Sequence, residues 1–204
     1  MLKIFLSTIL LITASMASAS PFKVDGDTIY YDTENTEGVY EIDYGHEEEL
    51  LSLLKKHEGI KTIILNSSGG FMKPAQDMSS LIIDANLNTY VEFECSSSCV
   101  DMFLGGQNRT LALGGKLGFH KSFWEADSIK EYYESEKEDQ EWSNPFEFAS
   151  WLYEDTQVDV FKAFEYLLER DVLPRFAIET LKAGSDGMWY PRRTELLNGG
   201  VLKE

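Results

Sequence analysis

The sequence predicts an α/β fold with a mostly parallel sheet and a long helical insertion. Short apolar runs rich in β-branched residues alternate with amphipathic helical segments over roughly the first 120 residues. Such alternation is typical of parallel strands joined by crossover helices. At about residues 125–174 the pattern becomes helical and acidic instead. The sequence contains no internal repeat or linker, so we expect a single domain at 20–204 that carries this insertion.

The first elements are expected to be a hairpin, a helix and a buried strand. Residues 23–44 alternate polar and apolar side chains around glycine turn signals, which is typical of a hairpin or two short strands. Residues 47–57 place leucines at helical spacing, with acidic residues early and lysines late, as the helix dipole favours. Residues 61–65 (KTIIL) are typical of a buried strand, and a polar loop follows at 66–70.

The following segments repeat the alternation. We expect a helix at 73–86, a strand at 89–94, a helix from about residue 100, and short strands at 110–113 and 116–119. His120 directly follows the last of these strands.

The composition is that of an acidic globular protein. Of the 204 residues, 43% are hydrophobic, and 35 acidic residues against 18 basic ones give a net charge of −17. Phosphate binding needs clustered Lys and Arg, so we expect no nucleic-acid partner and no binding to an anionic membrane surface.

The amino terminus has the layout of a secretory signal peptide. Lys3 gives a positive start, Ile4 to Ile12 form an apolar run, and Ala17-Ser18-Ala19 is a small-residue cleavage site. The alternative is an uncleaved anchor, although the apolar run is short for a membrane span. We expect a signal peptide at 1–19, cleavage after Ala19, and a periplasmic or secreted protein without membrane association after cleavage.

The stretch CSSSC, Cys95 to Cys99, contains both cysteines of the chain. A strand leads into it and a helix follows, and a serine at such a turn is either a helix cap or an exposed nucleophile. A disulfide between Cys95 and Cys99 is compatible with the expected oxidising compartment and would rigidify the turn. A zinc site with His120 as third ligand is the alternative. However, the Cys-x3-Cys spacing is uncommon for zinc, and no second Cys or His cluster completes the set of ligands.

Two further features accompany the serine cluster. The loop Asn66-Ser67-Ser68-Gly69-Gly70 follows a strand, and its glycines allow the backbone to approach a ligand closely. His120 is the histidine that lies at a strand end after the serines, where it could serve as a base or as a hydrogen-bonded core residue.

Together these motifs resemble the Clp protease/crotonase superfold, and among its members secreted (periplasmic) Clp-protease-like bacterial proteins. The segment from Ile64 to Gly70 is similar to the Clp protease Ile-Asn-Ser-Pro-Gly-Gly loop, with Ser68 in place of the proline. The spacing from Ser97 to Gly106 matches the nucleophile segment, and Gly118-Phe119-His120-Lys121 matches the strand that ends in the catalytic histidine. Residues 188–202 resemble the closing segment of the family. The resemblance therefore implies a ββα superhelix with a mostly parallel sheet.

The resemblance also implies site residues. The catalytic set would be Ser97, His120 and Asp186, and the oxyanion donors would be the backbone N–H groups of Gly70 and Ser98. Asp186 lies one or two residues from the spacing of the family's acidic residue. The insertion takes the place of the helices through which Clp subunits assemble, so a homo-oligomer is left open.

The sequence thus predicts a secreted serine hydrolase, a peptidase acting on a peptide or protein substrate, without cofactor or metal. The alternative is a non-catalytic scaffold of the same fold that binds a peptide or a partner. An acyl-CoA enzyme of crotonase type is a third reading, but the acidic charge would repel the phosphates of coenzyme A.

Overall fold

The computed structural model describes residues 19–184 and 186–203. The predicted signal peptide, except for Ala19, lies outside the described residues. The strands are β1 (Phe22–Asp25), β2 (Thr28–Asp32), β3 (Thr62–Ser67), β4 (Asn88–Ser96), β5 (Arg109–Leu111) and β6 (Lys116–Gly118). The helices are α1 (His46–Lys56), α2 (Met72–Asp84), α3 (Cys99–Leu104), α4 (Ala126–Glu136), α5 (Pro145–Glu169), α6 (Pro174–Glu179) and α7 (Arg193–Asn198).

The strands form one mixed, mostly parallel sheet in the order β1-β2-β3-β4-β5, with β6 also paired to β4. β1 and β2 are an antiparallel hairpin, and the other pairs are parallel. This agrees with the predicted α/β fold, because α1, α2 and α3 each connect strands that run in the same direction.

One face of the sheet is packed and the other is partly open. Alternate residues of the strands, among them Ile63, Leu65 and Val91, are fully buried, whereas Ile64 and Tyr90 between them are half-buried. A strand sends successive side chains to opposite faces, so the first set forms the core with the helices and the second set lines the other face. Apolar residues of α2 and α3, such as Met78 and Phe103, complete that core.

β4 changes its partner halfway along, and this change positions the candidate site. Its first half (89–91) pairs with β5, and its second half (94–96) pairs with β6. A register shift between Leu65 and Ser67 of β3 marks the same place on the other side of β4. Such irregularities bend a strand and redirect the side chains that follow, here those at the start of α3.

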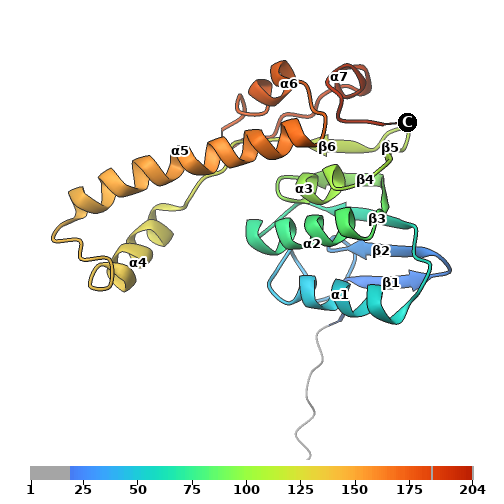
Figure 1. The fold of residues 1–204 in the computed structure, drawn as a ribbon, viewed down its shortest axis with the longest axis horizontal. Coiled ribbons are helices and arrows are strands. Elements are labelled where there is room, and N and C mark those ends of the chain that lie inside the picture. Colours follow the sequence, from blue (N-terminus) through green and yellow to red (C-terminus); the bar gives the residue numbers. More distant parts are fainter. Residues whose placement is uncertain (1–18, 185, 204) are drawn as a thin grey trace, which may run out of the picture.

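The insertion forms an arm. Figure 1 shows α4 and α5 reaching away from the strands, whereas α6 and α7 lie at the carboxyl-terminal end of the molecule. Asn144 caps α5 by accepting from the backbone N–H groups of Phe146 and Glu147, and Pro145 occupies the first helical turn. Aromatic rings join α4 to α5, among them Tyr132, Trp142, Phe148 and Trp151. None of the helices within 19–184 and 186–203 has the length and apolar character to cross a membrane.

Candidate active site

Ser97 lies on a strained turn between β4 and α3. Its φ is 55°, in the left-handed region that residues other than glycine rarely adopt. The Ser97 N–H donates to the carbonyl of Gly118 (3.0 Å), and the Ser97 carbonyl accepts from Val100 (3.0 Å). Backbone strain of this kind costs about 1–3 kcal/mol and is commonly found at functional sites. The Ser97 residue itself is half-buried.

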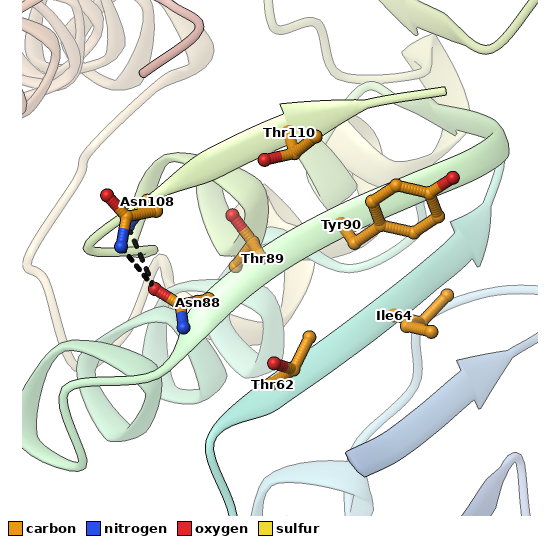
Figure 2. Close-up of a pocket in the computed structure, with 7 residues that line it drawn as sticks. All are labelled: Thr62, Ile64, Asn88, Thr89, Tyr90, Asn108 and Thr110. Carbon is orange, nitrogen blue, oxygen red and sulfur yellow. Dashed lines mark hydrogen bonds between the residues drawn. The ribbon is translucent and has the colours of Figure 1, made fainter. Parts of the chain in front are cut away.

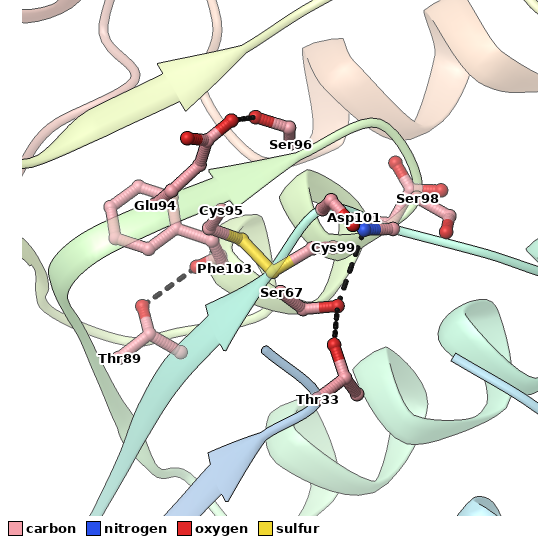
Figure 3. The surroundings of a disulfide bond; sticks show 12 residues. Thr33, Ser67, Thr89, Glu94, Cys95, Ser96, Ser98, Cys99, Asp101 and Phe103 are labelled. Atoms are coloured by element: carbon pink, nitrogen blue, oxygen red, sulfur yellow. Dashed lines mark hydrogen bonds between the residues drawn. A yellow bond between two sulfur atoms is a disulfide. The ribbon is translucent and has the colours of Figure 1, made fainter. Parts of the chain in front are cut away.

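The three serines of CSSSC have three different hydrogen-bond partners. The Ser96 hydroxyl donates to Glu94 (2.8 Å), as Figure 3 shows, and the Ser98 hydroxyl donates to the carbonyl of Gly70 (3.0 Å). The Ser97 hydroxyl lies 2.7 Å from Nε2 of His120. Of the three, Ser97 is therefore the serine that is paired with a potential base.

His120 is held in the tautomer that a base requires. Its Nδ1 lies 2.9 Å from the carbonyl oxygen of Lys121. A carbonyl oxygen can only accept, so Nδ1 carries the proton of the neutral ring and Nε2 is left to accept the hydroxyl proton of Ser97. Phe123 packs beside the ring, with centroids 5.8 Å apart.

The pairing of β4 with β6 brings Ser97 and His120 together although they are 23 residues apart. Ser96 is in register with Gly118, two residues before His120. A Cβ atom at Gly118 would lie 2.4 Å from Oγ of Ser96, so glycine allows the two strands to approach here. Phe119 then forms an antiparallel bridge to Trp189, which fixes the chain just before His120.

The Gly69-Gly70 loop lies directly against this turn. Gly69 has a φ of 110°, and a Cβ there would lie 2.6 Å from Cβ of Ser97. Gly70 has a φ of 147°, and a Cβ there would lie 2.4 Å from backbone atoms of Ile42. Both positions require glycine, for conformation and for space. The buried Ser67 supports the loop, because its hydroxyl accepts from the Gly69 N–H (3.2 Å).

The backbone N–H groups of Gly70 and Ser98 have no acceptor among the described residues. In the bridge to Ile42, the hydrogen bonds are made by the Gly69 carbonyl and the Phe71 N–H. The N–H of Gly70 takes no part in this bridge and remains on the side of Ser98, whose hydroxyl donates to the Gly70 carbonyl. Ser98 is the N-cap of α3, where N–H groups have no intrahelical partner. Both N–H groups are therefore available as hydrogen-bond donors.

Asp186 does not reach His120. It lies exposed in a turn closed by a hydrogen bond from Gly187 to Gly184 (3.2 Å), and no hydrogen bond joins it to His120 within the described part of the chain. The Lys121 N–H donates to the Ala183 carbonyl (3.2 Å), and Phe119 pairs with Trp189. The structure thus departs from the predicted three-residue arrangement: the Lys121 carbonyl occupies the place expected for the acid.

Cys95 and Cys99 form a disulfide and are fully buried, with Cα atoms 5.3 Å apart. The bond, which Figure 3 shows, links the two ends of the segment that contains the three serines. It joins the end of β4 to the first residue of α3, so it restrains the turn that carries Ser97. Across residues 19–184 and 186–203, His, Cys, Asp and Glu side chains form no group of three that would suit a metal ion.

A shallow hollow of about 470 Å³ lies elsewhere, on the open face of the sheet (Figure 2). Its lining is uncharged and consists of Thr62, Ile64, Asn88, Thr89, Tyr90, Asn108 and Thr110. Ser97 and His120 do not contribute to it, so it is separate from the candidate active site.

Comparisons with known proteins support the fold. No protein-family model and no curated protein sequence matches the chain. Among solved structures, a peptidase from Plasmodium falciparum is 12% identical with a TM-score of 0.55, over 87% of this chain and 94% of that one. A ClpP1 mutant from Listeria monocytogenes is 14% identical with a TM-score of 0.51, over 79% and 84%.

A protein described as an enoyl-CoA hydratase from Streptomyces coelicolor A3(2) is also similar, at 10% identity and a TM-score of 0.53, over 100% of this chain and 71% of that one. At such identities the likeness concerns the fold alone. The chain therefore has the Clp protease/crotonase-like fold, and its chemistry has to be argued from its own residues.

Proposed function

We propose that this protein is a serine hydrolase of peptidase type that uses Ser97 as nucleophile and His120 as base. The observation that carries the proposal is the 2.7 Å contact between Ser97 Oγ and His120 Nε2, made by a serine with left-handed backbone beside two unpaired N–H groups. A nucleophile, a base in the required tautomer and oxyanion donors are the parts that acyl transfer needs.

In the proposed reaction, His120 Nε2 takes the proton of the Ser97 hydroxyl as Oγ bonds to the substrate carbonyl carbon. The oxyanion that forms accepts from the N–H groups of Gly70 and Ser98, and each such donor contributes about 3–4 kcal/mol of transition-state stabilisation. The protonated His120 then gives its Nε2 proton to the leaving amine, and water releases the acyl group. The Lys121 carbonyl keeps Nδ1 protonated throughout.

A polypeptide is the proposed substrate, because exposed aromatic side chains lie next to His120 and directly after the Gly69-Gly70 loop. Phe71 follows Gly70 and packs on Tyr44, with centroids 5.2 Å apart, and Phe123 packs on His120. Phe71 and Phe123 are each 46% exposed. Such surfaces suit the side chains of an extended peptide.

The test is covalent labelling of the mature protein with a fluorophosphonate probe. We expect labelling of the wild type, loss of labelling in Ser97→Ala, and unchanged labelling in Ser68→Ala, an exposed serine of the adjacent loop. Peptide libraries would then give the cleavage preference. Labelling that persists in Ser97→Ala, or a wild type that neither labels nor cleaves, would contradict the proposal.

The second candidate is a non-catalytic binding protein of the same fold. The observation that favours it is that His120 Nδ1 faces a neutral carbonyl instead of a carboxylate, which stabilises the imidazolium ion less. This candidate predicts an unlabelled Ser97 together with measurable peptide binding, and Gly69→Ala should then weaken that binding.

Two further proposals concern the setting of the protein. Export to the periplasm or the medium, with cleavage after Ala19, is supported by the buried Cys95–Cys99 disulfide, and sequencing of the mature amino terminus tests it.

Self-association through the arm is supported by exposed apolar side chains of α5, such as Tyr153 (72%) and Phe161 (63%). Light scattering of wild type and Phe161→Glu tests the second.

A further inference from the structure

Three segments of the chain meet at the carboxylate of Glu94, just before the serine cluster. Its Oε1 accepts from the hydroxyl groups of Ser96 (2.8 Å) and Tyr190 (2.6 Å), and its Oε2 pairs with the ammonium group of Lys116 (3.1 Å). The Lys116 ammonium group also lies 5.1 Å from the centre of the Tyr190 ring.

These three segments are the ones that carry and fix the Ser97–His120 pair. Glu94 lies on β4, which leads to Ser97, and it is in register with Lys116 on β6, which leads to His120. Tyr190 follows Trp189, the residue bridged to Phe119. A shift of β6 along β4 would therefore break the contacts of Glu94 and separate Ser97 from His120 at the same time.

The contacts of Glu94 are better suited to fixing geometry than to adding stability. The Lys116 side chain is 54% exposed, and exposed ion pairs contribute about 0–1 kcal/mol. Three donors on one carboxylate nevertheless leave it little freedom. Burial alone would raise the pKa of Glu94, but hydrogen bonds from Tyr190 and Ser96 and the pairing with Lys116 lower it, so the carboxylate remains charged.

We propose that Glu94, together with Tyr190 and Lys116, is a positioning group that sets the register of β6 on β4 and so holds His120 within reach of Ser97. The inference rests on the proposed function, because a register of this kind matters for chemistry only if Ser97 and His120 react together. Misplacement of a catalytic group by about 1 Å typically costs on the order of 100-fold in rate.

The experiment compares Glu94→Ala and Glu94→Gln with wild type in two measurements. The first is the second-order rate of fluorophosphonate labelling across pH, with circular dichroism to verify folding. We expect a loss of about 10- to 100-fold in Glu94→Ala and partial recovery in Glu94→Gln, which can still accept hydrogen bonds. The second is ¹⁵N NMR of the His120 ring, where Glu94→Ala should lose the single Nδ1-protonated form.

Asp27→Asn is the matched control. It removes another exposed ion pair, that of Asp27 with Lys61, which lies just before β2 and β3 and also has a length of 3.1 Å. Labelling and the His120 spectrum should be unchanged there. If Glu94→Ala does not fold, Tyr190→Phe removes one donor without changing the shape of the side chain, and we expect a smaller loss in the same direction.

The outcomes separate the two proposals. Wild-type labelling rates and an unchanged His120 spectrum in the Glu94 variants would overturn the positioning role and leave the hydrolase proposal intact. Equal losses in Glu94→Ala and Asp27→Asn would overturn it as well, because the effect would then be general. If the wild type does not label, the hydrolase proposal fails, and the His120 spectrum still decides whether Glu94 positions the ring.

Discussion

The two ends of α3 are stabilised in opposite ways. At its amino end, Ser97 is strained and the N–H of the N-cap residue Ser98 has no acceptor among the described residues. At its carboxyl end, the carbonyl of Leu104 accepts from both Arg109 (3.3 Å) and Arg170 (2.9 Å). One end of the helix thus has an N–H group without such an acceptor, and the other is closed by positive charge, which also suits the helix dipole.

Arg109 is the centre of the closed end. It is fully buried, and it donates to the carbonyls of Arg170 and Gly200 at 2.7 Å each. Burial and, to a smaller extent, the neighbouring charge of Arg170 lower the pKa of Arg109 to about 10, whereas Asp171 opposes the shift. The side chain thus ties α3, the end of α5 and the carboxyl-terminal segment into one unit. The comparison predicts that this end contributes stability and the other end contributes chemistry.

The largest effect on stability is expected for Arg109→Ala. The change leaves buried carbonyls unsatisfied and a cavity behind, at a cost of about 3–5 kcal/mol in the free energy of unfolding. Urea denaturation measures it. Arg175→Ala is the control, because that side chain is 83% exposed in its ion pair with Glu179 and should change the stability by less than about 0.5 kcal/mol. Similar losses in both variants would contradict the importance of the closed end.

Gly69→Ala should have the largest effect on chemistry. Its Cβ would meet Cβ of Ser97 at 2.6 Å, so we expect labelling of Ser97 to fall by about 100-fold. Gly59→Ala is the control that introduces backbone strain without a steric clash, because Gly59 has a φ of 89° and open space around it. That variant should lose about 1 kcal/mol of stability and no reactivity. A reactive Gly69→Ala would show that the loop can move away from the serine.

The disulfide is expected to affect both properties moderately. Replacing Cys95 and Cys99 together by alanine removes a short cross-link, which corresponds to roughly 2 kcal/mol in the chain-entropy model. Labelling should fall several-fold, because the turn that carries Ser97 loses its restraint. Thermal unfolding and labelling of the double variant measure the two effects. Unchanged labelling would mean that the Gly69 contact and the β4–β6 pairing suffice to hold the serine.

For Asp101, in the first turn of α3, we expect a smaller effect on the stability of the protein, and this effect depends on pH. Burial raises the pKa of Asp101 to about 7. A folded-state pKa above the unfolded value of about 3.9 means that the native state holds the proton longer, so stability decreases as pH rises through this range and levels off above pH 7. In Asp101→Asn, the decrease in the free energy of unfolding with rising pH should be smaller than in wild type by about 1–2 kcal/mol. Chemical denaturation at pH 5 and pH 8 measures the difference, and identical slopes would contradict it.

The smallest effect is expected for Asp186→Asn. The Lys121 carbonyl already holds His120 Nδ1, so labelling of Ser97 should change by less than about threefold, whereas loss of an orienting aspartate typically costs about 10⁴-fold. A decrease of 100-fold or more would mean that Asp186 moves to His120 when substrate binds.

The sequence predicted the regular elements better than the site. β3 and β4 lie close to the expected strands at 61–65 and 89–94, because hydrophobic periodicity is a local property. The proximity of Ser97 and His120 followed from a family resemblance and not from periodicity. The left-handed backbone of Ser97 and the use of the Lys121 carbonyl depend on which distant segments pair, and a backbone carbonyl has no side-chain signature in a sequence.

Two side-chain roles were missed for the same reason. The family resemblance gave Ser98 a role through its backbone alone and gave Ser96 no role, whereas the structure gives each hydroxyl its own partner, Glu94 for Ser96 and the Gly70 carbonyl for Ser98. The acid two residues before Ser96 was visible in the sequence. Its partners Lys116 and Tyr190 were not identifiable, because they lie 22 and 96 residues away.

The left-handed backbone of Ser97 also sets a trade-off between folding and reactivity. Glycine adopts a φ of 55° without steric cost, so Ser97→Gly should raise the free energy of unfolding by up to about 1 kcal/mol while it removes the hydroxyl. Selection for thermal stability alone would thus favour loss of the proposed nucleophile. The same substitution offers a durable, inert form of the protein in which a bound peptide could be captured intact for crystallography.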